Sequence, residues 1–231
     1  LEEIGNRYAT GEREIRTLVD NTEIFIMPSM NPDGSELHQR ANAQSVDLNR
    51  DFPDFSVDDH NTPEKRAPET AAIMAFQAAH NIALSANFHG GAQVVNYPWD
   101  EIQERFPFDA LVQDLSLGYA TRAPYIYQSQ EFHNGITNGF DWYIVNGGMQ
   151  DWSYHYYNDL QLTIELSDTK WPAYSTIPDF YQKNRDSLIY LLESVHRGAG
   201  FAVNKPEISG TVKIFAIGAN GAEKDIGSYN F

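Results

Sequence analysis

The stretch from Ala83 to Ala92 constrains the fold most, because a strand-length apolar run stops abruptly on a histidine followed by two glycines. The run 83–88 is typical of a buried strand, and the glycines allow the backbone to turn sharply after it. His89 is therefore expected at the carboxyl edge of a sheet, where open α/β sheets gather their ligand sites. A lone histidine there is more often a hydrogen-bonded structural residue than a ligand, so other residues must decide between the two.

Helix-like and strand-like segments alternate along the first 197 residues, and this order is typical of an α/β domain. The apolar periodicity predicts helices over residues 1–8, 12–19, 68–80, 108–120 and 179–196. It predicts strands over residues 22–27, 83–89, 93–97, 142–145 and 160–166.

The pattern changes after the run Gly198-Ala199-Gly200. Residues 201–203 and 211–217 alternate as strands do, Gly218–Gly221 is typical of a hairpin turn, and no helix is expected beyond them. So short a segment does not bury a core alone. We therefore expect one domain over residues 1–197 and an incomplete all-β module over residues 198–231.

The chain is strongly acidic, with 16 Lys and Arg against 32 Asp and Glu and a formal net charge of −16. This charge argues against a nucleic-acid partner, because phosphates would be repelled. No apolar run is long enough to span a bilayer, so no membrane partner is expected. The chain has no cysteine, which excludes disulfides, thiolate zinc sites and a cysteine nucleophile.

Arg40, Asn49 and Arg50 lie close together in a polar loop. A single surface arginine usually pairs with a nearby acid or is solvated. Two arginines beside an asparagine in an acidic protein better suit a carboxylate clamp, because the planar guanidinium binds a carboxylate with two hydrogen bonds.

Three further residues are candidates, each with a plain structural alternative. Glu165 lies within the apolar run 160–166, where a carboxylate suits either a general base or a structural salt bridge. Tyr143 precedes the pair Gly147-Gly148, which could let it move, although such a tyrosine is most often a core residue. Asp100 follows an expected strand and is most often a turn residue.

Several longer strings resemble the zinc metallocarboxypeptidases, most closely the carboxypeptidase N/E (regulatory) branch. They appear in the same order and with compatible spacing, and the resemblance covers nearly the whole first domain. It implies a mixed, mostly parallel sheet flanked by helices, followed by the start of a transthyretin-like β-sandwich. The strings are residues 27–34 (MPSMNPDG), 47–53 (DLNRDFP), 84–91 (LSANFHGG), 135–139 (GITNG), 147–152 (GGMQDW) and 163–166 (TIEL).

For the reaction itself, the resemblance implies roles for three residues. His89 matches the third zinc ligand of the family. Glu165 matches the general base that activates the zinc-bound water, and Arg40 matches the arginine that polarises the scissile carbonyl and stabilises the oxyanion. The implied reaction is hydrolysis of the C-terminal peptide bond.

For the substrate, the resemblance implies roles for five more residues. Asn49 and Arg50 match the pair that holds the C-terminal carboxylate, and Tyr143 matches the tyrosine that closes over it. Gln150 matches the base of the specificity pocket. Asp100 matches the acid that selects a C-terminal Lys or Arg, so the expected partners are peptides or proteins ending in a basic residue.

The sequence departs from the family at the metal. The family's first two zinc ligands come from a His-x-x-Glu motif, and none of the seven histidines has a glutamate three residues later. In the family this motif precedes the segment where the chain starts, and the chain begins at Leu1 instead of Met. We therefore expect a piece of a longer zinc-binding protein, inactive as written because two ligands lie outside it.

Two alternative functions stay open. One is a catalytically inactive relative that only binds peptide C-termini, which an upstream segment without His-x-x-Glu would favour. The other is a deacylase of N-acyl amino acids, against which the carboxylate clamp and the closing tyrosine argue. From the habit of the family, the protein is expected to be secreted or periplasmic.

Overall fold

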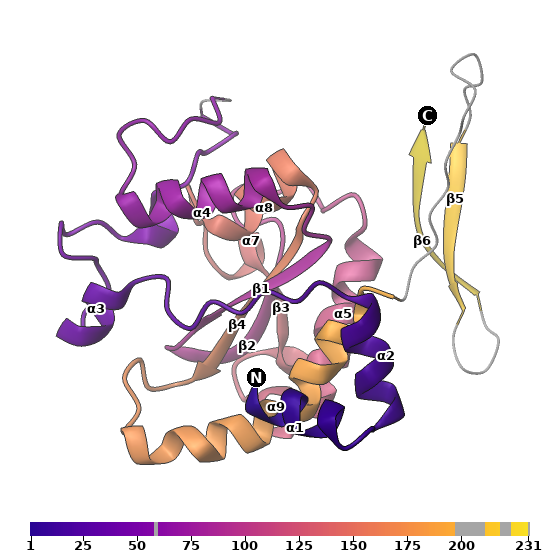
Figure 1. Ribbon diagram of the computed structural model, residues 1–231. Coiled ribbons are helices and arrows are strands. Elements are labelled where there is room, and N and C mark those ends of the chain that lie inside the picture. The colour runs from indigo at the N-terminus through magenta and orange to yellow at the C-terminus, as the bar shows by residue number, and fades with distance from the viewer. Residues whose placement is uncertain (58–59, 197–210, 218–222, 231) are drawn as a thin grey trace.

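The computed structural model describes residues 1–57, 60–196, 211–217 and 223–230 (Figure 1). A four-stranded sheet lies between two layers of helices. Its strands are β1 (Leu84–His89), β2 (Ala92–Tyr97), β3 (Ile136–Asn138) and β4 (Leu160–Ser167). The helices are α1 (Glu2–Ala9), α2 (Arg13–Asn21), α3 (Pro32–Leu37), α4 (Pro68–Ala79), α5 (Asp109–Arg122), α6 (Pro124–Tyr127), α7 (Gly139–Trp142), α8 (Met149–Tyr157) and α9 (Ile177–Ser194), with single 3-10 turns at Leu48–Arg50, His133–Gly135 and Tyr174–Thr176.

The sheet has the strand order β1-β4-β2-β3 and is mixed. β1 and β4 are parallel, as are β2 and β3, whereas β2 and β4 are antiparallel. Two of the three pairings are thus parallel, which confirms the expected mixed, mostly parallel α/β fold. Among the described strands, β1 pairs only with β4 and forms one edge of the sheet.

Each face of the sheet packs against its own helices. The larger core joins the sheet to α5, α6 and α9 through residues such as Leu162, Ile164 and Tyr119, all fully buried. A smaller core holds α4 and α8 together through Ile73, Met74 and Trp152, with Phe52 from the preceding loop. In Figure 1, α4, α7 and α8 lie on the opposite side of the sheet from α5 and α9.

Most of the elements predicted from periodicity are confirmed within a few residues, but two predicted strands are wrong. Residues 22–27 form no strand; instead, the Phe25 ring packs edge-on against Phe76 and His80 of α4, at centroid distances of 5.0 and 4.7 Å. The run has strand propensity, but propensity without a partner strand does not make a ladder.

Residues 142–145 are the second wrong strand. Trp142 ends α7, and the Val145 amide donates to the Asp100 carbonyl at 3.2 Å, so this backbone bonds to the turn after β2 and does not join the sheet. Periodicity also missed α3, α6, α7, α8 and β3, which are short or lie in polar sequence.

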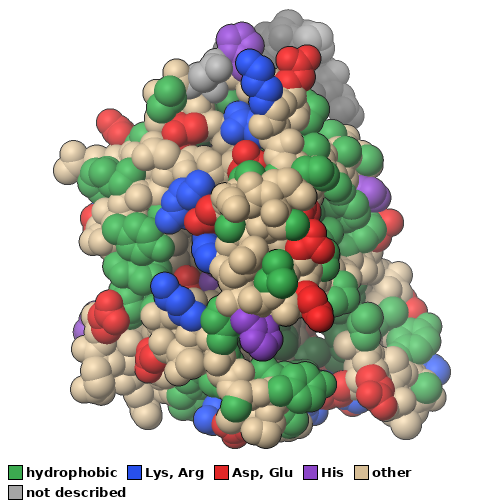
Figure 2. Space-filling view, turned by 90° about the vertical axis from the view of Figure 1, so that its left-hand side faces the viewer, with side chains coloured by type: hydrophobic (Ala, Val, Ile, Leu, Met, Phe, Trp, Pro, Cys, Tyr) green, Lys and Arg blue, Asp and Glu red, His purple; other side chains and the backbone are tan. Residues whose placement is uncertain are grey.

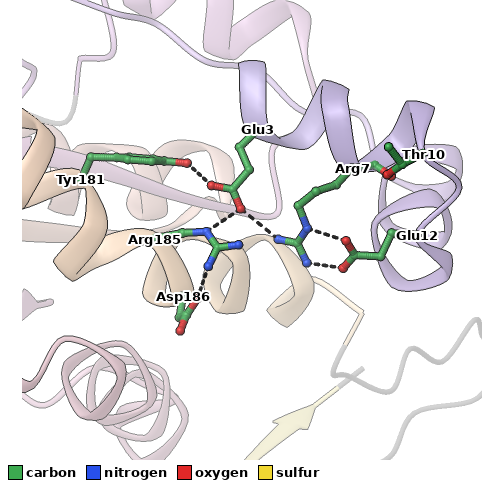
Figure 3. Close-up of polar contacts among 7 residues, drawn as sticks. All are labelled: Glu3, Arg7, Thr10, Glu12, Tyr181, Arg185 and Asp186. Carbon is green, nitrogen blue, oxygen red and sulfur yellow. Dashed lines mark hydrogen bonds and ion pairs between the residues drawn. The ribbon is translucent and has the colours of Figure 1, made fainter.

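A network of charged groups joins the two ends of this α/β unit (Figure 3). Glu3 of α1 accepts hydrogen bonds from Arg185 Nε, at 2.5 Å, and from the Tyr181 hydroxyl, both on α9. Arg7 bonds Glu3 on its own helix at 3.2 Å and also pairs with Glu12, which precedes α2. One carboxylate thus links α1 to α9 across most of the chain.

The last described elements are the strands β5 (Thr211–Ile217) and β6 (Glu223–Asn230), which pair antiparallel. β5 confirms the strand predicted over 211–217, while residues 201–203 and the predicted turn lie outside the described residues. The two-domain division and the transthyretin-like module remain predictions. Among the described helices, none combines the length and the apolarity that crossing a membrane requires.

Candidate active site

The carboxyl ends of two parallel strands bring His89 and Glu165 together. β1 and β4 are paired in register, and His89 lies directly opposite Glu165. Residues paired across adjacent strands project on the same face of a sheet, so the imidazole and the carboxylate share one face. Glu165 is only 8% exposed, and its Oε2 atom is buried without a hydrogen-bond partner among the described residues.

Arg40 reaches this pair from the loop that follows α3. Its Nη1 atom lies 3.1 Å from His89 Nδ1, and its Nη2 atom lies 3.0 Å from Asp47 Oδ1. Since a guanidinium only donates, His89 Nδ1 is the acceptor and the ring proton of a neutral imidazole is on Nε2. The Arg40 side chain remains about half exposed. Asp47 and His89 hold the guanidinium in place, and its exposed part is accessible to a ligand.

Asn49 and Arg50 form a single turn beside the start of α8. The Asp47 carboxylate caps this turn by accepting from the Asn49 amide at 3.1 Å, and Asn49 Oδ1 accepts from the Met149 amide at 2.9 Å. Gly147 has φ +66°, and a Cβ there would lie 2.7 Å from the Arg50 carbonyl oxygen. A glycine is required for this close packing of the Arg50 turn against the start of α8. The glycine pair was predicted to let Tyr143 move, but in the structure Gly147 serves this packing instead.

Asp100 and Gln150 meet in a buried cluster of polar side chains. Asp100 Oδ1 accepts from Gln150 Nε2 at 3.0 Å and from Asn96 Nδ2 at 2.8 Å. The Asp151 carboxylate accepts from the Asp100 amide at 2.8 Å and so holds the backbone of the turn. A Cβ at Gly139 would lie 1.7 Å from Asp100 Oδ1, so only glycine leaves room for this carboxylate.

Unpartnered hydrogen-bond acceptors surround Asp100. The oxygens Asn96 Oδ1, Asn138 Oδ1 and Gln150 Oε1 are buried, and none has a hydrogen-bond partner in the described part of the chain. Buried polar atoms are nearly always bonded, so such a group of acceptors needs an explanation. A donor-rich cationic group would satisfy several of them together.

Tyr143 is a predicted site residue whose ring packs against a neighbouring tryptophan and not against another predicted site residue. It follows α7, its side chain is 46% exposed, and its ring packs edge-on against Trp142 with centroids 4.7 Å apart. Its role in closing over a substrate remains a prediction.

Burial sets the charges of the site. Burial and the nearby Arg40 and Arg50 charges lower the pKa of His89 to about 4, so its imidazole is neutral at neutral pH. Burial raises the pKa of Glu165 to about 7, against the opposing effect of the Arg40 and Lys170 charges. Burial likewise raises the pKa of Asp100 to about 6, opposed by the Asn96 hydrogen bond and the Arg50 charge.

The described residues do not make a zinc site by themselves. Catalytic zinc takes three protein ligands, and nowhere in the described ranges do three His, Asp or Glu side chains gather in a way that could hold a metal ion. His89 offers one nitrogen, and Arg40 contacts that nitrogen here.

Sequence reasoning missed three residues that hold the site together. Asp47 positions both Arg40 and Asn49, whereas Asn96 and Asp151 hold Asp100. Asp47 and Asp151 lie inside the motif strings, so their place beside assigned residues was the available signal. Asn96 is a buried polar residue in a strand that also contains Val94 and Val95, and it gave a similar but weaker signal.

Comparison with known proteins supports the same family. The chain matches the zinc carboxypeptidase family over residues 1–187. It is 40% identical over 216 residues to carboxypeptidase D of Homo sapiens, a match that covers 83% of this chain and 15% of that protein. The catalytic chain of carboxypeptidase N of Rattus norvegicus is 36% identical over 241 residues, covering 85% of this chain and 52% of the relative.

Among solved structures, thrombin activatable fibrinolysis inhibitor shares the fold. The TM-score is 0.67 at 18% sequence identity, and the match covers 85% of this chain and 57% of that one. The chain thus spans about half or less of the length of the two curated relatives named above. Together, the fold, the in-register pairing of His89 with Glu165 and these matches show that the chain belongs to the zinc carboxypeptidase family.

Proposed function

We propose that this chain supplies the catalytic base and the substrate-binding residues of a carboxypeptidase that releases a C-terminal Lys or Arg. The observation that carries the proposal is the convergence of Arg40, His89 and Glu165 on one face of the sheet, beside the Asn49–Arg50 turn. In the family, zinc supplies a polarised water and carbonyl when it is bound.

The chain's own residues have separable tasks in this proposal. Arg50 and Asn49 bind the terminal carboxylate, which places the last peptide bond of the substrate next to Glu165. Glu165 takes a proton from the attacking water and passes it to the leaving amine, a task that suits a carboxylate with a raised pKa. Arg40 donates hydrogen bonds to the oxyanion as its charge develops.

The preference for a basic residue rests on the buried polar cluster around Asp100. A buried carboxylate with unpartnered acceptors on Asn96, Asn138 and Gln150 favours a guanidinium or ammonium group, which brings both positive charge and several donors. An apolar side chain would leave these acceptors unsatisfied.

The reaction is tested with Glu165→Gln in a longer, zinc-loaded protein that supplies the two zinc ligands expected outside this chain. We expect loss of Arg release from a peptide ending in Arg, measured by mass spectrometry, with the peptide still bound because the clamp is intact. The exposed Glu36→Gln is the matched control and should retain full activity. Undiminished hydrolysis by Glu165→Gln would remove Glu165 from the mechanism.

A second candidate is a protein that binds peptide C-termini without cleaving them. The Asn49–Arg50 turn and the polar cluster around Asp100 favour it, since the described residues form both without a metal ion. Fluorescence anisotropy with a labelled Arg-ended peptide in the absence of zinc would detect this binding. Binding without turnover, even after zinc is supplied, would select this candidate.

A further inference from the structure

One face of the sheet is lined with polar side chains beneath the helices α4 and α8. Along β1 and β4, apolar and polar residues alternate strictly, so all the polar ones project on the same face. The apolar residues of the other face pack in or against the larger core, except Phe88, which is 46% exposed. The polar residues pair in register as Ser85 with Gln161, Asn87 with Thr163, and His89 with Glu165.

These side chains form a continuous hydrogen-bonded ladder. It ends at the pair Asn87–Thr163, which is next to the pair His89–Glu165. Asn87 Nδ2 donates to Gln161 Oε1 at 2.7 Å and to Thr163 Oγ1 at 3.1 Å. Gln161 Nε2 donates to Ser85 Oγ at 2.9 Å, and Ser85 donates to Asp159 Oδ2 at 2.7 Å. Gln77 of α4 bonds the same Asp159 oxygen at 2.8 Å.

Such a ladder is not expected to add much to the stability of the fold. Buried polar groups cost free energy unless each is bonded, and apolar residues of similar size often stabilise a core as well. What such a network adds is a defined arrangement of its members, although the oxygens Asn87 Oδ1 and Asp159 Oδ1 are buried without a hydrogen-bond partner among the described residues. Here it fixes the pairing of an edge strand, because β1 has no second partner among the described strands.

We propose that Asn87 is a positioning residue that holds His89 in place against Arg40 and Glu165. It bonds both Gln161 and Thr163, so it ties β1 to β4 at the pair next to His89 and Glu165. Without this tie, the end of β1 loses its side-chain link to β4 and the His89 ring moves away from the Arg40 guanidinium. The catalytic consequence rests on the proposed function, but the placement of His89 does not.

The ring nitrogens of His89 report this placement directly in the metal-free chain. Because Arg40 donates to Nδ1, the wild-type ring is expected as a single tautomer protonated on Nε2, visible in a ¹H–¹⁵N spectrum of the histidine rings. We expect Asn87→Ala to give a mixture of the two tautomers. Ser85→Ala is the matched control, because it breaks the same ladder on the same strand, two residues further from His89, and leaves the Asn87–Thr163 bond intact.

A single unchanged tautomer in Asn87→Ala, or an equal change in Ser85→Ala, would overturn the proposal. If Asn87→Ala does not fold, Thr163→Val removes one of the two bonds and is expected to shift the tautomers in the same direction.

In the zinc-loaded protein, Asn87→Ala should lower kcat by about tenfold with KM nearly unchanged, and an unchanged kcat would refute the catalytic part of the proposal. Absence of hydrolysis in a wild-type protein that carries all three zinc ligands would refute the proposed function and leave the tautomer test valid.

Discussion

At the scale of single residues, burial sets the charge states on which the proposed chemistry depends. The neutral His89 imidazole can accept from Arg40 or bind a metal, which a protonated ring could not do. Glu165 is buried beside two cations, so it is neither a surface acid nor a member of a tight ion pair. The alternative role of Glu165, a structural salt bridge, gains no support, because no described partner bonds its Oε2 atom.

Asp100 is the residue whose replacement best tests substrate choice. We expect Asp100→Ala to lower kcat/KM for peptides ending in Lys or Arg by at least about tenfold more than for peptides ending in Leu or Phe, since the cation loses its buried partner. The measurement is hydrolysis of a matched set of peptides that differ only in the last residue. Equal losses on basic and apolar peptides would refute the preference for basic residues.

Residue identities were more predictable than residue partners. Arg40, Asn49, Arg50, Asp100, Gln150 and His89 could be selected from the sequence because each lies in a motif string or in a telling local context. The contacts of Asp100 with Asp151 and Gln150 could not, because these residues lie about fifty positions away from Asp100 and meet it only through the fold. Asp47 and Asn96 are close in the chain to the residues they hold, but the sequence does not show which way their side chains point. Whether Asp100 would be a turn acid or a buried pocket acid depended entirely on those partners.

At the scale of elements, strands were predicted correctly where they have neighbours in the sheet. β1, β2 and β4 combine strand propensity with partners on the same sheet. Residues 22–27 have the propensity alone, and residues 142–145 bond a turn instead. Periodicity describes one segment at a time, so it gives no information on which partner is available.

The loop between α8 and β4 provides a prediction at this scale. Asp159 is fully buried there, and burial raises its pKa from 3.8 to about 6, although Ser85 and Gln77 donate to it. The folded state therefore holds this proton more tightly than the unfolded state. Its contribution to stability is complete below about pH 4 and is lost as the pH rises through about 6.

We expect Asp159→Asn to remove this part of the pH dependence. Between about pH 4 and pH 7, the unfolding free energy of the wild type should fall relative to that of the variant by on the order of 2–3 kcal/mol. Urea unfolding of both proteins at several pH values measures the difference, and titrations common to both cancel. The exposed Asp33→Asn serves as the control, and a constant gap between wild type and Asp159→Asn across this range would contradict the assignment.

At the scale of the whole molecule, the candidate site stands out by its charge. The chain carries a formal net charge of −16, yet Arg40, Arg50 and Lys170 act on the groups of the site. Figure 2 shows Lys and Arg side chains running along the face that carries α3, with acidic side chains on both sides of them. A local positive field in an acidic protein attracts a carboxylate end while the surrounding surface repels other anions.

The charged network of Figure 3 gives the prediction that concerns the whole fold, because Glu3 connects the first helix to α9. We expect Glu3→Gln to lower the free energy of unfolding by about 1 kcal/mol at low salt, since one carboxylate serves Arg7, Arg185 and Tyr181 together. Glu2→Gln is the control, because Glu2 is an exposed acid in the same helical turn. Urea unfolding at about 0.02 M and about 1 M salt measures the change, and the loss of unfolding free energy in Glu3→Gln should shrink at high salt because salt screens the charges. Equal effects of Glu3→Gln and Glu2→Gln would show that the network does not hold α1 against α9.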